Sequence, residues 1–544
     1  MKYRLLIVFL LMSSLTTAVS LPENIYFRAM RDEMARSKKD LRLPGEVKPF
    51  YIAYRVDVTQ KQVFSARLGA LVSEISEQEK QNTPSVRTAV YLYAGDSKHN
   101  SSGLDEPARL LHNQAIGRSS SMNSYDSLRD NLWYLTDREY VNAVKRAERK
   151  AALKRDKQLR TQEPEFSYAP RAQFVDTIAS FVPRERAHYN KWVKQLSAEG
   201  KKYSYLENFG VQLTFGQKEQ YFLDSEGNFY QLQIPNNTVV FQATLRNHDG
   251  LLEEINDEYI LPLEESLEKT FVEEKAARFL QYVQKMHKAR KGDFYTGPVL
   301  LVQDGAAQFL ERLLVENLRY TKPRLMESNM EDPTVGKLTK KINHRILSIG
   351  LDVVDRPSLR MFNGFPLTGF RPIDAEGVAA QELQVVENGK LKEIPTLRSL
   401  LPGQKSSNGH AYANYYYPRA ILSNVFVTAR QPLTEKQLEE KLLALCSEQE
   451  LEYCYIIHSW QGRDGLNLAE RIYTADGHRE PIYGLMAEQE NDTRALRDIV
   501  AAGDKLEIFG GEETAIIAPS LLINEIELKP IERNPDRPHF VPMP

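Results

Sequence analysis

The chain contains 544 residues, with a formal net charge of −2 and a mean hydropathy of −0.47. Its apolar fraction of 42% and charged fraction of 26% are ordinary for a globular protein, which excludes collagen-like and low-complexity chains. Because the net charge is close to zero, the whole molecule has no attraction to nucleic acid or to anionic lipid, and neither is expected as a partner. A chain of this length is expected to form two or three domains.

The first 20 residues have the three parts of a secretory signal peptide. Lys2 and Arg4 precede an apolar run from Leu5 to Met12, and Ala18-Val19-Ser20 fits the small-x-small rule for cleavage before Leu21. The apolar run is much shorter than the roughly 20 residues that cross a bilayer. We therefore expect an exported protein, periplasmic or extracellular, with no stable membrane anchor. An uncleaved anchor is the alternative.

Residues 21–160 are expected to form an N-terminal α/β region. Residues 48–60 and 85–95 alternate between apolar and polar side chains, as half-buried strands do. A long helix is predicted over 131–158, with Thr136 and Glu139 as a capping box at its start. The basic run at 145–160 is typical of a solvated helix face. A polyanion site is the alternative, but no interleaved aromatic residues support it.

Residues 161–292 are expected to form a middle region. After a predicted linker at 160–174, residues 203–250 have the pattern of a strand meander, in which Ser225–Asn228 is a hairpin turn. A helix with a buried apolar stripe is predicted over 263–290.

Residues 293–544 are predicted to be mostly strands and long loops, with a short amphipathic helix at 304–320. The expected fold class is therefore α+β, with one or more N-terminal mixed α/β domains followed by a mostly β C-terminal domain with few helices.

The two cysteines are Cys446, at the end of a helical pattern, and Cys454, in a strand-like run. An exported protein can oxidise such a pair, but two buried free thiols are the favoured prediction. Two cysteines eight residues apart, without histidines at ligand spacing, are a poor zinc signal.

Several C-terminal segments occur in an order that resembles a known family. They are YTGPVLL (295–301), SIGLDVVDRPSL (348–359), PIDAEGVAAQELQVVENGKLKEIPTLR (372–398), SSNGHA (406–411), PRAILSNVFV (418–427), LRDIVAAGDKLEIFGG (496–511) and IIAPSLLINEIEL (516–528). The set is similar to the TldD/PmbA family, also labelled modulators of DNA gyrase, whose active members are zinc peptidases acting on small or unfolded peptides. The resemblance extends upstream to YFLDSEG (221–227) and is weak over the N-terminal region.

The resemblance also shows what this chain lacks. In active members, the helix after the GPVLL-like strand carries HExxxH, in which two histidines bind zinc and the glutamate polarises water. By spacing, Glu311 and Glu316 stand in place of the histidines and Arg312 in place of the glutamate. The position of a third ligand, a C-terminal cysteine, falls near Phe509. No histidine occurs between 288 and 343, so a shift in register does not restore the motif.

A different metal site on this helix is not expected either. Residues five apart on an ideal helix lie about 140° apart around the axis, so Glu311 and Glu316 would converge only if the helix were distorted. Arg312 would also repel a cation. We therefore expect a charged, solvated helix face, with no metal and no cofactor.

Two polar segments remain as candidates for other roles. Asp374, Glu376 and Gly377 are more typical of turn chemistry than of catalysis, and Asn388-Gly389 predicts a tight hairpin. Asn408, Gly409, His410 and Tyr415, in a polar loop and the aromatic run after it, are candidates for lining a peptide cleft. An ordered surface loop is the alternative. His344, His410 and His458 are expected to be hydrogen-bonded structural residues.

Three functions are consistent with these features. The favoured one is a non-catalytic family member, a peptide-binding or partner subunit in peptide processing. It would form a homodimer or a heterodimer with an exported zinc-bearing relative. The second is an active peptidase on short or unfolded peptides that uses a relocated site. The third is an envelope interaction protein whose N-terminal region defines its role.

Overall fold

The computed structural model of the protein describes most of the chain. The described residues are 20–46, 48–72, 85–93, 95–97, 100–101, 124–156, 166–246, 252–302, 304–321, 335–413, 418–459, 469–487, 492–511 and 513–531. The predicted signal peptide, except Ser20, and Tyr415 lie outside them. In this part of the chain, no helix is long and apolar enough to cross a membrane.

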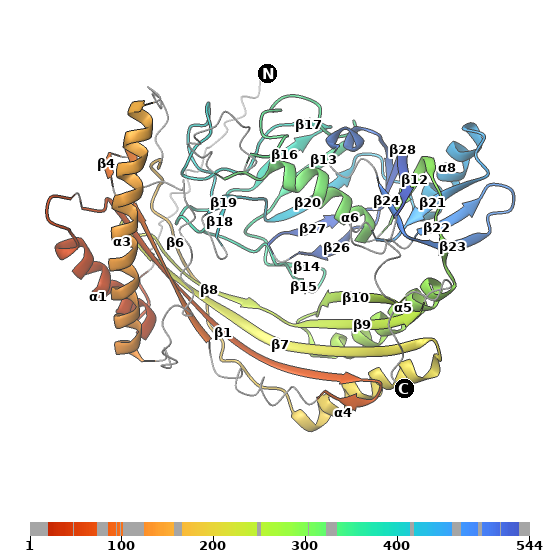
Figure 1. The fold of residues 1–544 in the computed structure, drawn as a ribbon, viewed down its shortest axis with the longest axis horizontal. Helices are drawn as coiled ribbons and strands as arrows, with labels where there is room; N and C mark the ends of the chain where they lie inside the picture. The colour runs from red at the N-terminus through yellow and green to blue at the C-terminus, as the bar shows by residue number, and fades with distance from the viewer. Residues whose placement is uncertain are drawn as a thin grey trace, which may run out of the picture.

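Two long antiparallel strands organise the N-terminal half. They are β1 (Tyr51–Arg67) and β7 (Leu206–Asp224), which pair from Ala53 opposite Asp224 to Arg67 opposite Gly210. Both are curved and extend beneath the C-terminal half (Figure 1). The strands that pair with the outer edges of β1 and β7 differ between the two ends of the sheet. The two ends also pack against different helices.

The first end has β3 (Ser85–Tyr93) beside β1 and β8 (Phe229–Pro235) beside β7, with β6 (Gln173–Val175) next to β8. The second end has β2 (Ala70–Leu71) beside β1 and β9 (Thr238–Arg246) beside β7, with β10 (Leu252–Ile260) at the edge. The first core contains side chains from α1 (Ile25–Asp40) and α3 (Tyr125–Asp156), and the second contains side chains from α4 (Arg186–Ala198) and α5 (Glu265–Lys288). A 3₁₀ turn, Glu199–Lys202, follows α4.

The predicted start of the long helix is wrong. Helix α3 begins at Tyr125, which places Thr136 in its interior, where the hydroxyl donates to the Leu132 carbonyl oxygen at 2.6 Å. Glu139 does not cap the helix and instead forms an ion pair with Arg146 at 3.2 Å. The buried side chains of Leu128 and Leu132 continue the apolar stripe upstream, and their packing outweighs the local capping signal.

Part of the predicted linker is packed structure. Phe166 is fully buried, with its ring 4.6 Å from that of Tyr51 and 3.8 Å from the guanidinium carbon of Arg398. Arg398, itself fully buried, makes two hydrogen bonds to the Glu226 carboxylate. These contacts join the N-terminal sheet to the C-terminal half.

The C-terminal half contains two larger sheets, which confirms the α+β fold class. The eight-stranded sheet contains β11 (Arg290–Lys291), β12 (Tyr295–Leu301), β21 (Tyr453–Ile457), β22 (Ala469–Tyr473), β23 (Arg479–Tyr483), β24 (Leu485–Ala487), β25 (Ile499–Ala502) and β28 (Leu521–Pro530). The six-stranded sheet contains β13 (Leu351–Asp355), β16 (Leu383–Glu387), β17 (Lys390–Leu391), β20 (Asn424–Ala429), β26 (Glu507–Gly510) and β27 (Ala515–Ala518). Short pairs are β4 (Gly95–Ser97) with β5 (Asn100–Ser101), β14 (Met361–Phe362) with β15 (Phe365–Pro366), and β18 (Ala411–Tyr412) with β19 (Arg419–Ala420).

One helical segment shares a core with both of these sheets. It begins as α6 (Asp304–Leu310), passes through a π turn at Glu311–Val315 and ends as α7 (Glu316–Leu318). Its apolar side chains pack with residues of β12 and β28 from one sheet and of β13 and β20 from the other. This position explains why most of the segment is buried. Another helix, α8 (Glu435–Glu448), contributes to a separate small core with β21, and a 3₁₀ turn lies at Thr493–Arg497.

The prediction of two free thiols is wrong, because Cys446 and Cys454 form a disulfide. Cys446 lies in the last turn of α8 and Cys454 in the adjacent strand β21. The turn between them brings the two Cα atoms to 6.0 Å, within the range that a disulfide spans.

The turn predictions are confirmed. Asn388 and Gly389 have φ values of 47° and 79° between β16 and β17, as a two-residue hairpin requires. A Cβ atom at Gly389 would lie 2.6 Å from the Leu347 carbonyl oxygen, so the position also needs glycine for space. The Asp374 carboxylate accepts the backbone N–H groups of Glu376 and Val378 and thereby closes its own turn.

Candidate functional site

A cavity of about 1770 Å³ lies between the N-terminal sheet and the C-terminal half. Its walls come from β10, from α5, from the start of α6 and from the segment around β26. The first two belong to the N-terminal half and the last two to the C-terminal half. The fold therefore builds the cavity by bringing distant parts of the chain together, and β10 and α5 lie below the C-terminal sheets in Figure 1.

The positions that match the zinc motif lie on the π turn. The backbone N–H of Glu316 donates to the carbonyl oxygen of Glu311, five residues earlier, as a π turn requires. The helix distortion that Glu311 and Glu316 need in order to converge is therefore present, and it brings them closer in angle than 140°. Arg312 is part-exposed, and its carbonyl oxygen accepts a hydrogen bond from the Asn317 side chain.

Arg319 occupies the space between the carboxylates. Its guanidinium lies 4.0 Å from Glu311, 3.6 Å from Glu316 and 3.9 Å from Glu513. Glu513 comes from the segment between β26 and β27, four residues after Phe509, and also pairs with Arg419. The side chains of Glu311, Arg319 and Glu513 are 29%, 21% and 16% exposed, whereas that of Glu316 is 52% exposed, so the face is solvated as the sequence predicts only at Glu316.

In this cluster, the positive charge of Arg319 offsets the negative charges of the carboxylates around it. Burial raises the pKa of Glu311, and the carboxylates of Glu316 and Glu513 raise it further. The guanidinium of Arg319 acts in the opposite direction and lowers it. Arg319 thus holds together carboxylates that would otherwise repel one another.

Zinc does not fit this donor set. Zinc in proteins is bound mostly by imidazole and thiolate groups, with few carboxylates. This cluster offers only carboxylates, and a guanidinium lies among them. Among the described residues, no group of three His, Cys, Asp or Glu side chains is placed to hold a metal ion. The cluster is an ion-pair network that includes the positions that the sequence analysis matched to the zinc motif.

The loop proposed to line a peptide cleft is tightly hydrogen-bonded. Asn408 accepts the backbone N–H of Thr396, and Gly409 has a φ of 78°. His410 is 1% exposed, and its Nε2 lies 2.9 Å from an Asp355 carboxylate oxygen. The expectation of a structural, hydrogen-bonded His410 matches this geometry. The cleft role of Asn408, Gly409 and His410 stays a prediction, and the cavity wall nearby is formed by Ala411 and Tyr412.

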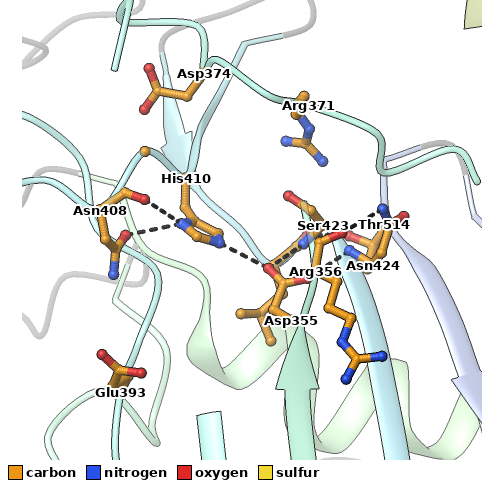
Figure 2. Close-up of polar contacts among 12 residues, drawn as sticks. Asp355, Arg356, Arg371, Asp374, Glu393, Asn408, His410, Ser423, Asn424 and Thr514 are labelled. Carbon is orange, nitrogen blue, oxygen red and sulfur yellow. Dashed lines mark hydrogen bonds and ion pairs between the residues drawn. The ribbon is translucent and has the colours of Figure 1, made fainter. Parts of the chain in front are cut away.

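Asp355 is the centre of a buried polar network (Figure 2). Besides His410, its carboxylate accepts the backbone N–H groups of Ser423 and Asn424 at 2.9 and 2.6 Å. Burial raises the pKa of the nearby Asp374 to about 6, while backbone hydrogen bonds and the charge of His410 oppose that shift. The carboxylates of Asp355 and Asp374 both accept hydrogen bonds from several backbone N–H groups. This geometry is that of a structural network that joins β13, β20 and the loop.

Sequence reasoning missed Arg319 and Glu513 as members of the motif cluster. Arg319 lies three residues beyond the last motif position, and Glu513 lies almost 200 positions further along the chain. A scan for charged residues near the expected C-terminal ligand would have found Glu513. No local pattern marks Arg319, because its role depends on the π turn and on Glu513 being near.

Comparison with known proteins identifies the C-terminal half. Residues 295–529 match the family model described as the PmbA/TldA metallopeptidase C-terminal domain. No curated protein sequence matches the chain.

Solved structures have the same overall fold. A proposed modulator of a DNA gyrase from Thermotoga maritima aligns over 92% of this chain and 100% of its own, with 14% identity and a TM-score of 0.59. TldE from Thermococcus kodakarensis aligns over 92% and 100%, with 13% identity and a TM-score of 0.56. A proposed modulator of DNA gyrase from Bacteroides thetaiotaomicron aligns over 93% and 98%, with 14% identity and a TM-score of 0.59. At these identities the similarity establishes the fold alone.

Proposed function

Because the chain belongs to the TldD/PmbA family, we propose that it is an exported, non-catalytic member that binds peptides or acts as a partner subunit in peptide processing. The observation that carries the proposal is Arg319, whose guanidinium lies within 4.0 Å of three carboxylates at the position of the family's zinc motif. A built-in cation there competes with any metal ion, and the glutamate that would polarise water is replaced by Arg312.

The cavity supports peptide binding. At about 1770 Å³ it exceeds the volume of pockets that hold small molecules, and its wall includes two strands at sheet edges. Among the described strands, β10 pairs only with β9 and β26 only with β27, so each has one edge without a neighbour. An extended peptide can pair with such an edge through its main chain, which gives affinity with little dependence on sequence.

The partner belongs to the proposal as well. The family resemblance implies a dimer, either with a second copy or with an exported relative that carries HExxxH. Export, expected from residues 1–20, requires that this partner and the peptides also be extracytoplasmic. A gel-filtration mass and co-purification of an HExxxH relative with the full-length protein distinguish the two kinds of dimer.

The first test measures metal and cleavage together. The full chain, purified from the exported fraction, is expected to contain much less than one zinc per chain and to leave an unfolded protein substrate, reduced casein, intact. One zinc per chain would overturn the proposal. Cleavage that persists with a chelator would favour the alternative of a relocated peptidase site. Stable association with envelope components, without retention of peptides, would favour the third function.

A further inference from the structure

One end of the cavity is lined by five charged side chains from four elements. They are Asp257 of β10, Lys275 and Arg278 of α5, Asp304 of α6 and Glu507 of β26. Asp304 interacts electrostatically with the other four, so they form one cluster. We call it the cavity charge cluster. None of its members takes part in the Arg319 network.

The charges of this cluster are not paired with one another. Within the described part of the chain, none of the five forms an ion pair at 4.0 Å or less, although opposite charges are neighbours. The ammonium of Lys275 lies over the rings of Tyr259 and Phe271, at 4.4 and 5.4 Å from their centroids. Asp257 accepts a hydrogen bond from the Tyr259 hydroxyl. The side chains of Asp304, Arg278 and Glu507 make no hydrogen bond with the described residues.

The balance of charge favours a cationic ligand. Three carboxylates face two cations, and the aromatic rings already stabilise one of these cations, Lys275. Burial, and next the charge of Asp257, raise the pKa of Asp304 to about 6. A positive group placed beside Asp304 would therefore stabilise an ionised carboxylate that the protein alone leaves poorly compensated.

We propose that the cavity charge cluster binds the free amino terminus of a peptide, with Asp304 as its main partner. This deepens the proposed peptide-binding function and rests on it. An α-ammonium is followed directly by a peptide carbonyl group, which Arg278 can bind as a donor. A lysine side chain brings a similar charge without a carbonyl beside it. The rings of Phe271, Tyr259 and Tyr282 line the same part of the cavity and offer apolar contact for the first side chain.

A second observation points to a ligand oxygen elsewhere on the wall of the same cavity. Arg371 is 9% exposed, and it forms no ion pair with the described residues. One of its nitrogens, Nη2, donates to the Glu513 carbonyl oxygen at 2.6 Å, and Nη1 has no hydrogen-bond partner in the described structure. A buried guanidinium with an unused donor is costly unless it meets an acceptor, and peptide carbonyl or carboxylate groups supply one.

The test compares two forms of one peptide pool. A random hexapeptide pool made without lysine is passed over the immobilised full-length protein, either with free amino termini or N-acetylated, and retained peptides are counted by mass spectrometry. We expect acetylation to lower retention at least about tenfold, because it removes the charge that Asp304 binds. Asp304→Asn is expected to lower retention of the free-amine pool to a similar extent and to leave the acetylated pool unchanged.

A matched control removes one negative charge nearby. Glu274→Gln, on an exposed residue of α5 next to Lys275 and outside the cavity wall, is expected to retain both pools as the natural protein does. Glu507→Gln, on an exposed residue of the cluster, serves as the second variant if Asp304→Asn does not fold. It is expected to lower retention of the free-amine pool only, by less than Asp304→Asn.

The outcomes separate the two proposals. Retention of neither pool by the natural protein would overturn the proposed peptide-binding function itself. Equal retention of both pools would overturn the amino-terminus assignment and leave peptide binding in place. Unchanged retention by Asp304→Asn or by Glu507→Gln would likewise show that the cluster is not the partner of the amino group. Retention of an N-acetylated, lysine-containing pool at the level of the free-amine pool would reassign the site to side-chain ammonium groups.

Discussion

Two charged clusters on one helical segment differ in how their charges are compensated. At Glu311 and Glu316, on the π turn, the carboxylates surround the guanidinium of Arg319 at 3.6 to 4.0 Å. At Asp304, two turns earlier, the carboxylate has no ion pair with the described residues and lines a cavity. The same helical segment thus carries one cluster whose charges pair with one another and one whose charges do not.

This difference distinguishes charged groups that stabilise the fold from charged groups that bind a ligand. A compensated cluster stabilises the fold and offers little to a ligand, because its charges already have partners. An uncompensated cluster lowers stability, and such a cost persists mainly where binding depends on it. If this interpretation is right, neutralising the two clusters must change stability in opposite directions.

The largest effect is expected for Arg319→Met. The substitution leaves three carboxylates close together, two of them mostly buried, and the free energy of unfolding should fall by on the order of 1–3 kcal/mol at pH 7. The loss should shrink near pH 4, because burial raises the pKa of Glu311 and protonation of that carboxylate relieves the repulsion. Urea unfolding at both pH values measures it.

Arg494→Met is the control, because Arg494 forms an ion pair with Asp492 while 77% of its side chain is exposed. We expect this variant to unfold at the same urea concentration as the natural protein, because exposed ion pairs contribute little to stability. If Arg319→Met is equally harmless, the motif cluster is not a stabilising network and the comparison fails.

Asp304→Asn is expected to act in the opposite direction. In the unfolded chain an aspartate has a pKa near 3.9, whereas burial holds the pKa of Asp304 at about 6 in the folded protein. Between these values the folded state binds a proton that the unfolded state has released, so stability falls as the pH rises through this window. The variant lacks this penalty and should be more stable than the natural protein by on the order of 1–2 kcal/mol at pH 8, after allowance for solvent exposure.

The pH dependence is the decisive part of this prediction. Below about pH 4 both states are protonated, so the advantage of Asp304→Asn should disappear there. Glu274→Gln, on an exposed residue of α5 outside the cavity wall, should show no such pH dependence. An Asp304→Asn variant less stable than the natural protein at pH 8 would mean that Asp304 is a structural group, like the motif cluster.

The amino-acid sequence predicts the fold through features that depend on near neighbours. Alternation over residues 48–60 predicts the first part of β1, and Asn388-Gly389 predicts its hairpin, because these signals act within a few residues. The ordered motifs of residues 295–528 supply the C-terminal domain. The capping signal at Thr136 fails because upstream leucines pack against distant strands, which no local pattern reports.

The charged sites depend on tertiary structure and were only partly predictable. Glu311 and Glu316 were identified by spacing, but the ideal-helix geometry could not include the π turn that brings them together. Arg319 and Glu513 meet only after β26 and the helical segment have packed. In the sequence, nothing distinguishes the members of the cavity charge cluster from ordinary surface charges. They form a site only because two halves of the chain enclose a cavity.

The smallest expected effect, for Glu316→Gln, tests how strongly the motif cluster is compensated. Glu316 is the most exposed of the three carboxylates, at 52%, and its charge raises the pKa of Glu311. Removing it loses an ion pair with Arg319 but also relieves repulsion with Glu311, so the two changes oppose each other. The free energy of unfolding should change by about 0.5 kcal/mol or less, measured by urea unfolding at pH 7. A loss as large as that of Arg319→Met would mean that Glu316 is the essential partner of the guanidinium, whereas a small change would show that Glu311 and Glu513 hold Arg319 in place without it.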